Sequence, residues 1–102
     1  MVKELTDLEF DKYTCVEGKV LIDCYATWCN PCKMLAPIIE ELSNTLKNVD
    51  FFKVDVDANN EVVQRYNIMS IPTILLFNNG KLIKSTTGFK TKEELIEFIE
   101  NE

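Results

Sequence analysis

Apolar residues recur along this chain with two periods, one typical of buried strands and the other of helices. Runs that are rich in apolar residues predict internal strands, because a strand covered on both faces carries few polar side chains; they cover residues 20–26, 49–56 and 73–77. Apolar residues at helical spacing predict helices over residues 31–47 and 61–66. These segments alternate along the chain, which is typical of α/β domains.

Residue pairs at helix starts predict two further helices. Thr6 and Glu9 have the spacing of a capping box, in which each side chain bonds the backbone N–H of the other residue, and they predict a helix over residues 7–13. Thr91 and Glu94 have the same spacing, and they predict the start of a C-terminal helix with one apolar face. That face consists of Leu95, Ile96, Phe98 and Ile99.

A hairpin turn completes the predicted fold. Asn79–Gly80 is a strong hairpin signal, and it joins the strand at residues 73–77 to a returning strand at residues 81–86. With a short edge strand at residues 2–5, the predicted order is β-α-β-α-β-α-β-β-α. We therefore expect one α/β domain, residues 1–102, with a central mixed β-sheet flanked by helices on both faces.

Composition and charge exclude several classes of function. The 102 residues are 46% apolar, which is enough for a packed core. The formal net charge of −6 argues against a nucleic-acid-binding protein, which needs a basic surface to neutralise phosphates. No run reaches the roughly 18–20 apolar residues needed to span a membrane, and the N-terminus lacks the apolar stretch of a signal peptide. We expect a monomer in the cytoplasm that binds neither nucleic acid nor membrane.

Two of the four cysteines, Cys29 and Cys32, lie where a predicted strand gives way to a helix. On a first helical turn their spacing allows a disulfide to close with little backbone movement. The helix N-terminus would stabilise the first thiolate, and the second cysteine could attack a mixed disulfide that the first creates. The alternatives are half of a zinc site or an inert structural pair, but the chain has no histidine, and Cys15 and Cys24 lack the spacing of a zinc ribbon. Cys24 is instead predicted to be a small core residue. Cys15 is predicted to be an exposed loop residue, with a regulatory or dimer-forming role as the alternative.

Residues 23–33 carry a resemblance to a known family. Their core resembles the thioredoxin active-site segment Trp-Cys-Gly-Pro-Cys-Lys and has the sequence Trp28–Cys29–Asn30–Pro31–Cys32–Lys33. A second segment, Ile71–Pro72–Thr73, resembles the family's loop with a cis-proline facing the cysteines. Asn79–Gly80 and Gly88 also stand where the family has its hairpin and a later glycine. Because the similarity extends from end to end, the chain is identified as a member of the thioredoxin family, which implies the thioredoxin fold.

The resemblance implies roles for the cysteines and for two charged residues. Cys29 would be the attacking thiol and Cys32 the resolving thiol. Asp23 matches the family's buried acid, which assists deprotonation of the resolving cysteine; burial raises the pKa of a carboxyl group, so this group could exchange a proton near neutral pH. Lys53 matches the lysine that lies near that acid. Without the resemblance, Asp23 could instead be an acid held by hydrogen bonds at a strand end, and Lys53 a solvent-exposed strand residue.

The resemblance also implies a substrate-binding surface. A cis bond before Pro72 would turn the backbone of Ile71 toward a substrate chain and allow β-type pairing; without the resemblance, an ordinary trans turn is the alternative. For Trp28 the alternative is a packed aromatic side chain with no binding role. The residues expected at this surface are Trp28, Asn30, Pro31, Val56, Ile71 and Gly88.

One departure from the family lies between the cysteines, where Asn30 replaces the usual glycine. The identity of this residue tunes the reduction potential, and we expect an amide N–H of Asn30 to donate to the Cys29 thiolate and lower its pKa. Ser70 and Thr87 also stand where the family often has smaller or more apolar residues, so substrate preference could differ.

The function that the resemblance implies is that of a general dithiol electron carrier. It would reduce disulfides in partner proteins such as peroxiredoxins or reductases and be recharged by a thioredoxin reductase. The expected chemistry uses no organic cofactor and no metal. The alternatives are a reductant dedicated to one partner and a thioredoxin-fold binding module whose surface matters more than its thiols. The intact cysteine pair, Asp23 and Pro72 weigh against the binding module.

Overall fold

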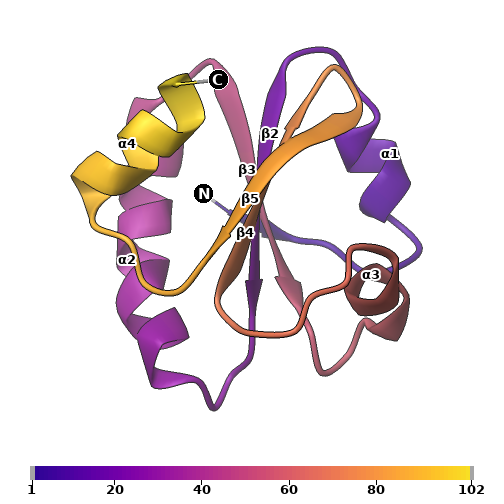
Figure 1. Cartoon of the computed structure of the whole chain (residues 1–102). Helices are drawn as coiled ribbons and strands as arrows, with labels where there is room; N and C mark the ends of the chain where they lie inside the picture. Colours follow the sequence, from indigo (N-terminus) through magenta and orange to yellow (C-terminus); the bar gives the residue numbers. More distant parts are fainter. Residues whose placement is uncertain (1, 102) are drawn as a thin grey trace.

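The structure is a computed structural model, and it describes residues 2–101. Its elements follow one another in the predicted order (Figure 1). They are β1 (Lys3–Glu4), α1 (Phe10–Thr14), β2 (Lys19–Tyr25), α2 (Asn30–Thr45), β3 (Val49–Asp55), α3 (Asn60–Arg65), β4 (Thr73–Asn78), β5 (Lys81–Thr87) and α4 (Lys92–Glu100). Within residues 2–101, no helix has the length and apolar character needed to cross a membrane.

The strands form one mixed sheet in the order β1-β3-β2-β4-β5. The first three strands are parallel to one another, whereas β4 is antiparallel to both β2 and β5. Figure 1 shows α2 and α4 on one face of the sheet and α1 and α3 on the other. The predicted fold class, a mixed sheet with helices on both faces, is therefore confirmed.

Two hydrophobic cores lie on the two faces of the sheet. Alternate residues of β2 enter different cores, because successive side chains of a strand point to opposite faces: Leu21 packs beneath α2 and α4, and Ile22 packs beneath α1 and α3. On β4, Leu76 packs in the core beneath α2 and α4, and Leu75 packs in the core beneath α1 and α3. This double burial is the reason that these strands appear in the sequence as nearly continuous apolar runs.

The first helix begins three residues later than predicted, at Phe10. Thr6 and Glu9 do not form a full capping box there: the N–H and hydroxyl of Thr6 both donate to the Glu9 carboxylate, but the N–H of Glu9 donates to the Thr6 carbonyl. At α4, by contrast, Thr91 and Glu94 form the complete box. The difference shows that the spacing alone does not place a helix start.

The turn between β4 and β5 is the predicted hairpin. Asn79 and Gly80 have φ values of 53° and 84°, a left-handed conformation that asparagine and glycine adopt most readily. Asn79 also ties the turn to the start of β2, since its side-chain oxygen accepts from the Gly18 N–H at 2.9 Å and its own N–H donates to the Gly18 carbonyl at 3.0 Å. The hairpin is thereby fixed at the opposite end of the molecule from the first turn of α2.

Candidate active site

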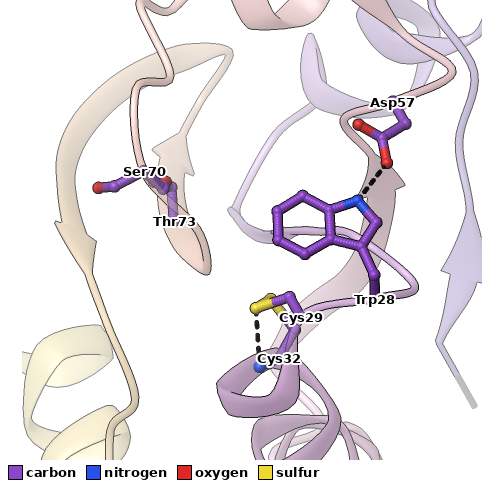
Figure 2. The surroundings of a disulfide bond; sticks show 6 residues. All are labelled: Trp28, Cys29, Cys32, Asp57, Ser70 and Thr73. Atoms are coloured by element: carbon purple, nitrogen blue, oxygen red, sulfur yellow. Dashed lines mark hydrogen bonds between the residues drawn. A yellow bond between two sulfur atoms is a disulfide. The ribbon is translucent and has the colours of Figure 1, made fainter.

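The cysteine pair lies where β2 leads into α2. Cys29 is the N-cap residue of α2, and it forms a disulfide with Cys32 across a Cα–Cα distance of 5.2 Å. The Cys29 sulfur accepts a hydrogen bond from the Cys32 backbone N–H at 3.2 Å (Figure 2). Cys29 is 5% exposed and Cys32 is 3% exposed, so exposure does not distinguish the two sulfurs in the disulfide form. The two sulfurs differ in their position relative to α2, because Cys29 is the N-cap residue and Cys32 lies within the first turn.

A negative charge on the Cys29 sulfur would be stabilised at this position. The first N–H groups of a helix have no partner within the helix, and the helix dipole is positive at that end. Both effects favour the thiolate over the thiol. Among the described residues, the hydrogen bond to this sulfur comes from the Cys32 backbone, whereas Asn30 is an exposed residue at the start of α2. The expected donation by the Asn30 amide concerns the Cys29 thiolate of the reduced protein, and it stays a prediction because the structure holds the disulfide.

Asp23 is buried behind the disulfide. The residue is 4% exposed, and its Oδ1 atom has no hydrogen-bond partner among the described residues. Lys53 is its register partner on β3, so both side chains lie on the same face of the sheet. Burial raises the pKa of the Asp23 carboxyl to about 7, and the charge of Lys53 acts in the opposite direction. The group can therefore gain or lose a proton near neutral pH.

A cavity of about 250 Å³ connects this acid with the second cysteine. Asp23 and Lys53 line it from the sheet, while Cys32 and Lys33 line it from α2. Its size and polar groups suit water molecules. The Asp23 carboxyl and Cys32 therefore border the same cavity.

The loop before β4 brings a second segment to the disulfide. The Ile71–Pro72 peptide bond is cis, as the resemblance implies, and Ile71 packs against the small core cluster that contains both cysteines. Two contacts hold the loop: Gly88 N–H donates to the Pro72 carbonyl at 2.8 Å, and the Thr73 hydroxyl donates to the Ser70 carbonyl at 2.5 Å. Gly88 therefore lies beside the cis-proline.

A groove of about 270 Å³ lies beside Cys29 and brings together three of the predicted surface residues, Trp28, Val56 and Ile71. Trp28 is 66% exposed, and its indole N–H donates to the Asp57 carboxylate at 2.7 Å (Figure 2). Met69, which is 85% exposed, also lines the groove. Asp57 and Met69 were not predicted from the sequence, because an acid after a strand and a loop methionine have no motif that marks them.

The remaining cysteines lie apart from this site. Cys24 is fully buried in the core beneath α1 and α3, and burial raises the pKa of its thiol, so it is an inert core residue as predicted. Cys15 is exposed. Within residues 2–101, no group of three or more His, Cys, Asp or Glu side chains is arranged to hold a metal ion.

Comparisons with known proteins agree with this geometry. A family model described as thioredoxin matches residues 1–101. Thioredoxins of Listeria monocytogenes and Bacillus subtilis are 44% and 42% identical to this chain, and the alignments cover 97% and 96% of it and 96% and 94% of those proteins. The solved structure of Plasmodium falciparum thioredoxin superposes with a TM-score of 0.90 at 39% identity, covering 97% of each chain. That of Malassezia sympodialis thioredoxin superposes with a TM-score of 0.88 at 34% identity, covering 96% of this chain and 87% of the other.

Proposed function

This chain belongs to the thioredoxin family of protein disulfide oxidoreductases, and on that premise we propose that Cys29 attacks substrate disulfides and Cys32 resolves the product. The observation that supports this order is the position of the Cys29 sulfur, which lies at the N-cap of α2 and accepts the Cys32 N–H. These features stabilise the Cys29 thiolate and make it the better nucleophile near neutral pH.

The exchange takes place in two steps with no external atoms other than protons. The Cys29 thiolate attacks one sulfur of the substrate disulfide, which forms a mixed disulfide and releases the other substrate sulfur as a thiolate. The Cys32 thiolate then attacks the Cys29 sulfur, which forms the Cys29–Cys32 disulfide and releases the second substrate thiolate. The substrate gains two electrons and two protons, and the protein is left in the disulfide form described above.

Asp23 acts in the second step as the base that accepts the Cys32 proton. Three observations support this role: the raised pKa of its carboxyl group, the Oδ1 atom without a partner among the described residues, and the cavity that it shares with Cys32. A base whose pKa lies near the working pH is effective in both directions of proton transfer. Lys53 keeps that pKa from rising further.

A substrate chain binds along the groove beside Cys29. The Ile71 backbone next to the cis-proline pairs with it in a β-type arrangement, and the apolar side chains of Trp28 and Val56 contact its side chains. Gly88, whose N–H donates to the Pro72 carbonyl, lies beside this loop and adds no side chain there. Asn30 and Pro31, in the first turn of α2, lie at the same end of the molecule.

The partners belong to two classes. Thioredoxins in general act on disulfide-containing proteins and are recharged by thioredoxin reductase, and we assign the same cycle to this single-domain protein, with peroxiredoxins or disulfide reductases as substrates. It works as a monomer in the cytoplasm without a metal or an organic cofactor. The family membership and the full-length similarity to bacterial thioredoxins support this assignment.

Serine variants test the order of attack. With insulin as the disulfide substrate and NADPH with thioredoxin reductase as the reductant, Cys29→Ser should abolish turnover and form no adduct. Cys32→Ser should also lose turnover but accumulate a covalent mixed disulfide, detectable as a mass increase on non-reducing analysis. Cys15→Ser is the matched control and should keep the wild-type rate. Adducts on Cys29→Ser in place of Cys32→Ser would reverse the assignment.

A further inference from the structure

A row of alternating charges crosses the sheet next to the candidate site. Lys53 on β3 is the register partner of Asp23 on β2 and also of Glu4 on β1. Register partners in parallel strands direct their side chains to the same face, so Lys53 shares its face of the sheet with two acidic side chains, one from each neighbouring strand. An ammonium group in this position can be drawn to either neighbour, and its effect on Asp23 depends on which carboxylate it approaches.

Tyr25 bonds one of those two carboxylates. It lies two residues after Asp23 on β2 and so shares the face of the row. Its hydroxyl donates to the Glu4 carboxylate at 2.6 Å, and the Lys53 ammonium lies over its ring at 5.8 Å from the centroid. Burial of the ring, together with this hydrogen bond, raises the pKa of the Tyr25 hydroxyl, so it remains a donor at neutral pH.

The strand β1 supplies no lysine to this face that could pair with the Glu4 carboxylate. Lys3, the adjacent residue, points to the opposite face, where it pairs with Glu9 at 3.8 Å and lies over the Tyr13 ring. If the bond to Tyr25 were lost, the nearest cation in the row for the Glu4 carboxylate would be Lys53.

We propose that Tyr25 is a positioning residue: by holding the Glu4 carboxylate with its hydroxyl and the Lys53 ammonium over its ring, it keeps the charge of Lys53 directed at Asp23. The proposal rests on the role of Asp23 given above. Tyr25 would thereby set the pH range in which Asp23 exchanges a proton with Cys32. The other titratable or charged groups that surround Asp23 and Tyr25 are Cys24 on β2, Asp55 on β3, and Cys32, Lys33 and Glu40 on α2.

The pKa of Asp23 measures the effect directly. In the oxidised protein, NMR of the Asp23 carboxyl carbon across pH 5–9 should show that Tyr25→Phe raises this pKa by about 0.5, because Glu4 then competes for Lys53. The ring stays in place in this variant, so the shift would report the lost hydroxyl alone. Glu4→Gln by itself should not raise the pKa, since it removes the competing carboxylate.

The double variant separates this mechanism from a change in packing. In the Glu4→Gln background, Tyr25→Phe should no longer shift the pKa of Asp23. Tyr13→Phe, which removes the hydroxyl of another half-buried tyrosine that lies near lysines, should leave it unchanged. The proposal is overturned if Tyr25→Phe leaves the pKa unchanged, or if it shifts the pKa by the same amount in the Glu4→Gln background.

A kinetic measurement distinguishes a failure of the proposal for Tyr25 from a failure of the proposed role of Asp23. The pH midpoint for resolution of a preformed mixed disulfide should move upward in Tyr25→Phe by the same amount as the pKa. If the pKa moves and the kinetic midpoint does not, Tyr25 positions Lys53 as proposed, but Asp23 is not the base for Cys32.

Discussion

At the scale of single residues, Asp23 has the clearest energetic consequence. Its carboxyl group has a pKa of about 7 in the folded protein against 3.8 when it is exposed, because burial penalises the charged form more than Lys53 compensates. A group whose pKa is raised by folding holds its proton more tightly in the folded state. Its contribution to stability is therefore fully present below pH 4 and is lost as the pH rises to about 7.

Replacing this acid by its neutral amide should stabilise the protein in a pH-dependent way. The two pKa values correspond to about 4 kcal/mol lost at pH 8, so Asp23→Asn should raise the free energy of unfolding by up to about that amount. At pH 4 the gain should be close to zero. Urea unfolding of the oxidised proteins at the two pH values measures both quantities.

Asp50→Asn is the matched control, since this acid is exposed on the neighbouring strand β3. It should change stability little at either pH. A gain from Asp23→Asn that is the same at pH 4 and pH 8 would show that the carboxyl group does not titrate as the structure implies.

At the scale of an element, α3 depends on a residue from far away in the sequence. No side chain at its own N-cap, Asn59, caps the helix. Instead, the Asp7 carboxylate accepts the Glu61 N–H at 3.2 Å and the Val62 N–H at 3.0 Å, while the Asp7 N–H donates to the Asn59 side chain at 2.8 Å. Asp7 thus caps a helix more than 50 residues away and joins the segment before α1 to it.

Removing this cap should destabilise the fold by the amount typical of a helix cap. We expect Asp7→Ala to lower the free energy of unfolding by about 1–2 kcal/mol, because two backbone donors lose their acceptor. Asp7→Asn keeps one acceptor oxygen and should recover part of the loss. Chemical denaturation measures both changes, with Glu17→Ala, at an exposed loop acid, as the control. A loss no larger than that of the control would contradict the capping role.

At the scale of the whole molecule, the sheet joins two cores that depend on each other. Leu75 and Leu76 are adjacent on β4 and are 1% and 0% exposed, but they point into opposite cores. Each core uses the same strands as one of its walls, so we expect the two cores to unfold together. This arrangement supports the expectation of a single domain over residues 1–102.

Truncating either leucine should therefore weaken one common unfolding transition. Leu75→Ala and Leu76→Ala should each cost about 2–5 kcal/mol, and fluorescence and far-UV circular dichroism should give coincident curves for both variants. Leu82→Ala, at a residue of β5 that is 41% exposed, should cost far less. Separate transitions in either core variant would contradict a single cooperative domain.

Much of this architecture could be predicted from the sequence because its signals are local. The apolar runs of β2 and β4, the Asn79–Gly80 turn and the Thr91–Glu94 box each depend on residues within a few positions of one another. The cysteine pair is local in the same sense, since one helical turn brings both sulfurs together.

Other features depended on contacts between distant segments. Asp7 looks like part of the first helix, but its carboxylate caps α3; Trp28 bonds Asp57, and Tyr25 bonds Glu4. A polar side chain takes the partner that the register of strands and the packing of helices bring within about 3 Å, and neither is a property of the nearby sequence. The hydrogen bond to the Cys29 sulfur is local by contrast, because the first turn of α2 directs the Cys32 backbone N–H to it.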